Sequence, residues 1–171
     1  MASSYVHWGT RLVAVDTYDW LLFLHVTGAF LVLGGAVMAG VFNFAALRRE
    51  RPSEIAVLFR LARVAAIAIG AGMVLTLGFG LWLVHQVGYG WGETWIVLAL
   101  VLWVLANALG GIGAGREKQT RELAERLAAE GDAPSRELSS RLRDPVSLAL
   151  SWGSGVVIVA ILALMIWKPG A

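Results

Sequence analysis

The sequence predicts an all-α integral membrane protein, a four-helix bundle with its N-terminus and C-terminus outside. The 171 residues are 58% hydrophobic and only 15% charged, and their mean hydropathy is +0.70. Soluble domains carry about 25% charged residues, so this chain has too few charges to cover a water-facing surface. Its apolar residues form four blocks, each close to the ~20 residues that span a bilayer core. The blocks are continuous and do not alternate with polar residues, which favours helices over barrel strands.

The four spans are expected at about 20–47, 61–86, 94–115 and 146–167. The first is long enough to tilt or to extend past the lipid. The segment before it contains no apolar run as long as a signal peptide requires, so we expect the first span to direct insertion. The sequence predicts no second domain, and we treat 1–171 as a single membrane domain.

The orientation follows from the positions of lysine and arginine. Twelve of the fourteen basic residues lie in or beside the connections between the first and second spans and between the third and fourth spans. The short connection "VGYGWGE" has none. By the positive-inside rule both basic connections are cytoplasmic, which predicts a bacterial-type inner (cytoplasmic) membrane protein. The net charge of +2 is then a topology signal, and we expect the lipid bilayer and no nucleic acid as a partner.

The segment 116–145 is expected to form a cytoplasmic helical hairpin that extends the third and fourth spans. In "REKQTRELAERLAAE", oppositely charged residues recur four positions apart and support a solvated helix, as in the pairs Glu117–Arg121 and Glu122–Arg126. "GDAPS" breaks that helix, and Ser135 is expected to cap a second one. Pro145 is expected to open the fourth span.

Small residues recur every four positions in three of the spans, which predicts close helix–helix packing. The rows are Gly72, Thr76 and Gly80; Ala106, Gly110 and Ala114; Asn107, Gly111 and Gly115; and Ser147, Ser151 and Gly155. Tryptophans near the ends of the spans are expected to form an interfacial aromatic belt, namely Trp91, Trp95, Trp152 and Trp167.

Two histidines are the candidate ligands. His25 lies in the first span, about 7–8 Å below its outer end, and His85 ends the second span at a similar depth. Ionisable residues inside a membrane usually face the bundle and have a function. Two imidazoles at one depth suit the axial positions of a b-type haem. Small or flat residues one and two turns away would make room for the ring, and the candidates are Gly28, Gly35, Gly78 and Trp82.

Simpler interpretations remain open for these residues. His25 is also compatible with an interhelical hydrogen bond, and His85 with a solvated side chain at the interface. No cysteine is present, which excludes thiolate chemistry and disulfides. The sequence contains no Ser–His–Asp arrangement, no phosphate-binding glycine loop and no carboxylate in mid-membrane. We therefore expect no catalytic residues and no enzyme activity from this chain by itself.

The first span, "LLFLHVTGAFLVLGG", resembles the first helix of the CopD-like four-helix membrane proteins, a group that includes copper-resistance CopD and the HemJ-type protoporphyrinogen oxidases. The shared features are a Leu-His pair, small residues after it and a glycine pair in mid-helix. "GMVLTLGFGLWLVHQ" and the closing "LALMIWKPGA" are similar to the second helix and to the end of that group. The resemblance covers all four spans and places the chain in an uncharacterised branch.

The resemblance implies a b-type haem ligand role for His25 alone. HemJ-type enzymes also have a functional lysine at the start of the third helix, where this sequence reads "ETWIVLALVLW". Protoporphyrinogen oxidation is therefore not expected. The CopD-type alternative implies metal handling through His25, His85 and Met38.

Three hypotheses follow. The first is a haem-b-binding membrane protein that acts in electron transfer or as an accessory subunit of a larger membrane complex. The second is a cofactor-free scaffold or assembly subunit, in contact with other membrane-protein subunits or with copies of itself. The third is a copper-handling membrane protein.

Overall fold

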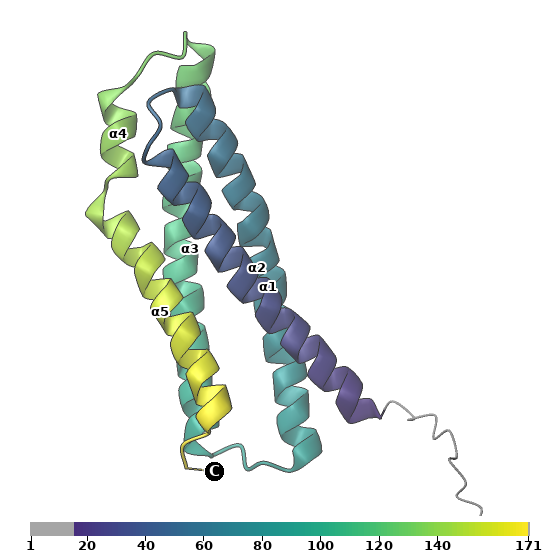
Figure 1. Ribbon diagram of the computed structural model, residues 1–171. Helices are drawn as coiled ribbons and strands as arrows, with labels where there is room; N and C mark the ends of the chain where they lie inside the picture. Colours follow the sequence, from purple (N-terminus) through teal and green to yellow (C-terminus); the bar gives the residue numbers. More distant parts are fainter. Residues whose placement is uncertain (1–15, 171) are drawn as a thin grey trace, which may run out of the picture.

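The computed structural model describes residues 16–170, and within this range every regular element is a helix. The helices are α1 (Thr17–Ala46), α2 (Pro52–Val87), α3 (Thr94–Ala129), α4 (Arg136–Leu142) and α5 (Pro145–Trp167) (Figure 1). Four helical segments are long and apolar enough to cross a membrane. The all-α, four-span architecture predicted from the sequence is confirmed. The N-terminal segment expected to lack a signal peptide lies mostly outside the described residues.

Side chains at the helix ends explain several of the boundaries. Asp16 caps α1 and forms a reciprocal capping box with Asp19. The Ser135 hydroxyl accepts a hydrogen bond from the Leu138 backbone N–H at 3.5 Å, so the predicted cap of α4 is confirmed. Pro145 is the first residue of α5, as expected.

Two helices are longer than the predicted spans. α2 begins at Pro52 rather than near residue 61, and α3 continues to Ala129. Both contain 36 residues, a length of about 54 Å, whereas a bilayer core is ~30 Å thick. The first helix of the predicted hairpin is therefore the continuation of α3. The second helix, α4, is separated from α5 by a turn at residues 143–144.

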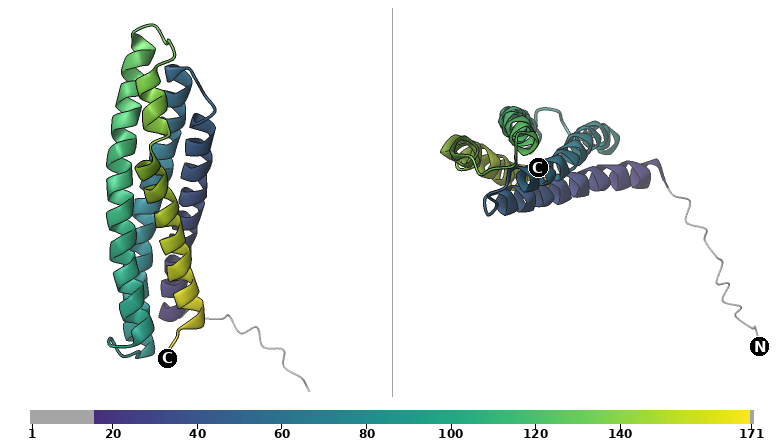
Figure 2. Two further views of the ribbon diagram at one scale, coloured as in Figure 1. Left: turned by 90° about the vertical axis from the view of Figure 1, so that its left-hand side faces the viewer. Right: turned by 90° about the horizontal axis from the view of Figure 1, so that it is seen from above.

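The helices form two pairs. α1 and α2 pack closely along their length, α5 packs along α3, and α2 joins the pairs through α3 (Figures 1 and 2). α5 barely contacts α1. We call the end with the α1–α2 connection and residues 116–144 the basic end. The opposite end, with the start of α1, the α2–α3 loop and the end of α5, is the terminal end (Figure 1).

The basic end has a core like that of a soluble domain. Its buried apolar residues come from α1, α2, α3 and α4 and are Ala46, Ile55, Ala56, Phe59, Leu123, Ala124 and Leu138. Ser53 donates from its backbone N–H and its hydroxyl to the Asp132 carboxylate, each at 2.7 Å. These bonds, together with the charge of Arg51, hold the pKa of Asp132 below its usual value.

The ion pairs of the basic end differ from those expected. Arg121 pairs with Glu125 at 4.0 Å and Lys118 with Glu122 at 3.9 Å, instead of the predicted Glu117–Arg121 and Glu122–Arg126 pairs. Glu125 also accepts from Arg60 of α2 at 2.9 Å. Glu125 therefore lies between Arg60 of α2 and Arg121 of α3 and links the two helices.

The small-residue prediction holds for one helix pair and fails for the other. A Cβ on Gly72 would lie 2.6 Å from the Gly28 carbonyl oxygen, so the backbones of α1 and α2 are in contact there. In α3 and α5, by contrast, the predicted rows leave open space around several glycines, namely Gly110, Gly111, Gly115 and Gly155. α3 and α5 meet instead where Gly113 faces Leu150 and Gly153 faces Leu109.

Candidate functional site

A cavity of about 480 Å³ lies toward the terminal end, between α1, α2, α3 and α5. Its walls are mostly leucine, isoleucine, valine and aromatic side chains. A few polar groups interrupt them, from His25, Thr76, Tyr89 and Lys168 in particular. Small-molecule sites typically have volumes of about 300–1,000 Å³, apolar walls and a few placed polar groups. This cavity has all three features.

His25 has a defined protonation pattern. Its Nδ1 lies 2.9 Å from the Thr76 backbone carbonyl oxygen. A carbonyl oxygen only accepts hydrogen bonds, so Nδ1 carries the proton and donates. In the neutral ring, Nε2 then keeps its lone pair and acts as the acceptor or ligand atom. A backbone carbonyl that binds the second ring nitrogen is the usual support of a metal-binding histidine.

Glycine in α2 makes room for this histidine. A Cβ on Gly80 would lie 2.9 Å from both Nδ1 and Cε1 of His25. Nearby, a Cβ on Gly28 would lie 2.6 Å from the Thr76 hydroxyl oxygen and 2.7 Å from the Thr76 backbone nitrogen. The absence of side chains at these two positions lets α1 approach α2 closely enough for the His25–Thr76 hydrogen bond to form.

The structure groups some of the predicted site residues and separates others. His25 lines the cavity, while Gly28 and Gly35 are buried where α1 meets α2. Three predicted residues, His85, Gly78 and Trp82, are exposed on another face of α2 and do not line the cavity. They are separated by four and three positions, so they share one side of the helix. His25 of α1 therefore packs against one side of α2, and His85 projects from another side of α2.

Several cavity residues escaped the sequence interpretation. Thr76 and Gly80 were expected only as packing residues, although their spacing of four from Gly72 placed them on the correct face. Trp103 and Lys168 were not assigned to any site, yet both line the cavity, as does Met73. The sequence alone could not identify these residues, because they come together only through the packing of four helices.

Two polar atoms of the cavity residues are buried without a hydrogen-bond partner among the described residues. They are the indole Nε1 of Trp103 and the hydroxyl oxygen of Thr76. Buried polar groups are paired in the large majority of cases, and an unpaired one in a native structure calls for an explanation such as a bound group. Both atoms belong to residues that line the same cavity as His25.

An aromatic cluster closes the terminal end. The Tyr89 and Trp95 rings meet edge to face with centroids 5.4 Å apart, and the Trp95 Nε1 donates to the Glu93 carboxylate at 2.6 Å. Trp95, expected in the interfacial belt, is 7% exposed and belongs to the interior. The other tryptophans assigned to the belt, Trp91, Trp152 and Trp167, are exposed as expected.

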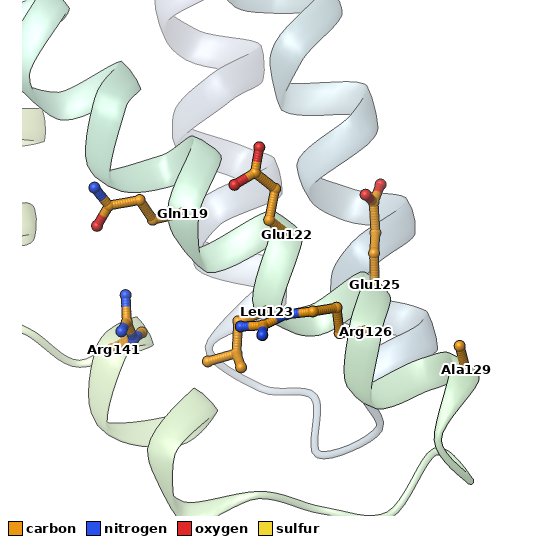
Figure 3. A pocket seen from close by; sticks show the side chains of 7 residues that line it. All are labelled: Gln119, Glu122, Leu123, Glu125, Arg126, Ala129 and Arg141. Atoms are coloured by element: carbon orange, nitrogen blue, oxygen red, sulfur yellow. The ribbon is translucent and has the colours of Figure 1, made fainter.

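An open groove on the basic end is less suited to chemistry. It lies between α3 and α4, has a volume of about 690 Å³ and is lined by Gln119, Glu122, Leu123, Glu125, Arg126, Ala129 and Arg141 (Figure 3). Its charges are of both signs, and two of the carboxylates are engaged in ion pairs. Among residues 16–170, no group of three or more His, Asp or Glu side chains could hold a metal ion.

One family model matches residues 19–169, which are nearly the whole chain, and its description reads "Predicted integral membrane protein (DUF2269)". The chain belongs to this family. Neither the curated proteins nor the solved structures include a significant match. The membership supports a membrane protein family without specifying the CopD-like or HemJ-like branch.

Proposed function

We propose that this multi-pass integral membrane protein binds haem b in the cavity and uses His25 as an axial ligand. In this proposal the protein acts in electron transfer, or as an accessory subunit of a larger complex in a bacterial-type inner membrane. Both termini are outside, so the cavity is in the outer half of the bilayer. Haem b supplies a one-electron iron couple when bound.

The observation that carries the proposal is the state of His25. Its Nδ1–H is fixed on the Thr76 carbonyl, and its ring borders a cavity of about 480 Å³ with apolar walls. The chain therefore presents one oriented nitrogen ligand within a space suited to a flat apolar group. Trp103, whose Nε1 is buried without a hydrogen-bond partner among the described residues, also lines the cavity.

The sequence suggested His85 as the second axial ligand, and the geometry favours a different assignment. His85 is exposed outside the cavity. The proposal therefore assigns one histidine ligand, His25, and no ligand role to His85. This difference makes His85 the matched control in the decisive experiment.

The experiment is a reduced-minus-oxidised visible spectrum of gently purified protein, with a pyridine haemochrome assay on the same sample. We expect near-stoichiometric haem b in the wild type and in His85→Ala, and loss of haem in His25→Ala and His25→Gln. The His25→Gln variant keeps a polar side chain that can still reach the Thr76 carbonyl. A flat spectrum from folded wild-type protein made with haem available would overturn the proposal, as would full haem retention in both His25 variants.

Copper is the second candidate, because Met73 and Met165 line the same cavity as His25. Thioether and imidazole ligands suit Cu(I). Met38, the methionine of the CopD-type alternative, is 51% exposed and does not line the cavity. Elemental analysis of the purified protein, followed by an anaerobic Cu(I) titration of the wild type and Met73→Leu, tests this candidate. If the purified protein contains neither haem nor copper, the hypothesis of a cofactor-free scaffold is favoured.

A further inference from the structure

Lys168 is the charged group at the mouth of the cavity. It follows the last residue of α5 and lines the cavity together with Tyr89 and Trp95. Its Nζ donates a hydrogen bond to the Tyr89 hydroxyl oxygen at 3.2 Å. The same ammonium lies 5.0 Å from the centroid of the Tyr89 ring and 5.6 Å from that of Trp95. These contacts hold the charge in one place.

No carboxylate neutralises this ammonium within the described part of the chain. None of the Asp and Glu side chains of residues 16–170 lies within 4.0 Å of it. Glu93 is the acidic residue nearest in the fold to the aromatic cluster, and it accepts from the Trp95 Nε1 at 2.6 Å and from the Gly90 backbone N–H at 3.1 Å. Lys168 thus has three N–H donors and one neutral acceptor.

A half-buried cation that is fixed by aromatic rings and has no carboxylate partner among residues 16–170 is suited to binding an anion. Here the cation and a histidine with a free Nε2 line one apolar cavity. His25 is eight residues into α1, about 12 Å from the helix start, whereas Lys168 is at the end of α5. The cavity therefore suits an amphiphile with a flat apolar body and an anionic group at one edge.

We propose that Lys168 binds a carboxylate of the ligand at the mouth of the cavity, which for haem b is a propionate. This inference rests on the proposed function, since it names the part of the chain that recognises the acidic edge of the same cofactor. Tyr89 and Trp95 are positioning residues, because they hold the ammonium. A lipid carboxylate or phosphate offers the same chemistry to Lys168, so the test must separate the two sources.

The test compares two probes on haem-depleted protein in nanodiscs of neutral lipid: haem b, and its dimethyl ester, which lacks both carboxylates. We expect the wild type to bind the ester about tenfold more weakly than haem b, a loss typical of one charge-assisted contact. Lys168→Gln should weaken haem b binding about tenfold and bind both probes equally. Lys168→Arg should retain most of the preference for the acid.

The chain offers a matched control, because Lys118 is its only other lysine. Lys118 is exposed at the basic end, where it pairs with Glu122. Lys118→Gln should therefore leave both affinities unchanged. The ester comparison on the wild type needs no variant, so it decides the question even if a Lys168 variant folds poorly.

The two proposals fail in different ways. If neither probe binds the wild type, the haem proposal itself is wrong. If both probes bind equally well with unchanged histidine-ligated spectra, haem binding stands and the role of Lys168 is refuted. If the wild type in neutral nanodiscs shows no preference for haem b but anionic lipid protects Lys168 from an amine-reactive reagent, Lys168 is a lipid headgroup site, and the carboxylate assignment is also refuted.

Discussion

The basic end and the terminal end of this bundle are closed by different means. At the basic end, side chains from four helices bury Ile55 and Leu138 to 1% exposure, and ion pairs surround them. At the terminal end, α1, α2, α3 and α5 leave a cavity of about 480 Å³ between them. A short helix accounts for the difference, because α4 adds a fourth wall to the basic end, while α5 barely touches α1 elsewhere. One end is closed by a packed apolar core, and the other keeps an open space between its helices.

The largest effect is expected from removing the side chain that closes the basic end. Leu138→Ala empties a fully buried position and should cost about 2–5 kcal/mol of unfolding free energy. Because α4 has only seven residues, the loss should appear as faster hydrogen exchange of α4 and of the facing turns of α2 and α3. Leu142→Ala, at a half-buried position of the same helix, is the control and should have a smaller effect. Equal exchange in the two variants would contradict a closed core at this end.

The next effect concerns the contact between α1 and α2 near the cavity. Gly28→Ala places a methyl group 2.6–2.7 Å from atoms of Thr76, one of which is backbone. The helices must separate, and we expect a loss of about 1–3 kcal/mol, as for other overpacked sites. Gly34→Ala is the matched control, since its Cβ would meet nothing within 4 Å. Thermal unfolding in detergent measures both. A stable Gly28→Ala variant would mean that this contact is looser than described.

Gly80→Ala is expected to reduce the stability of the fold less than Gly28→Ala does, and to weaken haem binding more. The methyl group of Gly80→Ala would meet only the His25 ring, and a side chain can move where backbone cannot. The moved ring loses its hydrogen bond to Thr76, so haem affinity should fall about tenfold or more, as when a supporting partner of a ligand is removed. The variant Gly78→Ala, in open space on the outer face, should bind haem normally. The measurement is a haem titration of both variants.

The sequence predicted the spans well because each depends on a local property, namely about 20 apolar residues in a row. Helix ends with their own side-chain signals, such as Ser135 and Pro145, were also predictable. The extension of α2 back to Pro52 was not, since residues 52–60 mix charges with Ile55 and Phe59. Those apolar residues are explained only by contact with Leu123 and Leu138, which are far away in sequence.

The site was only partly predictable for a related reason. His25 could be selected alone, because an imidazole within an apolar span is unusual. Pairing it with His85 required the rotation of α2, and neighbouring residues of a helix differ by about 100°. Equal depth in the membrane therefore did not imply a shared face. Lys168 and Trp103 belong to the site only through the way in which α3 and α5 meet α1 and α2.

The smallest predicted effect concerns pH at the basic end. The Ser53 hydrogen bonds lower the pKa of Asp132 in the folded chain, so folding favours the charged carboxylate. That contribution is fully present above the unfolded pKa of about 3.9 and is lost as the pH falls through the lower folded value.

Asp132 has a φ of 56°, which asparagine tolerates, so Asp132→Asn removes the charge without straining the turn. We expect the first turn of α2 and the 130–135 turn to become more susceptible to proteolysis below about pH 4 in the wild type, with a flatter profile in the variant. Because Asp132 is only half-buried, solvent screens the carboxylate and the difference should be modest. Parallel profiles would show that the Ser53–Asp132 contact does not hold the turn.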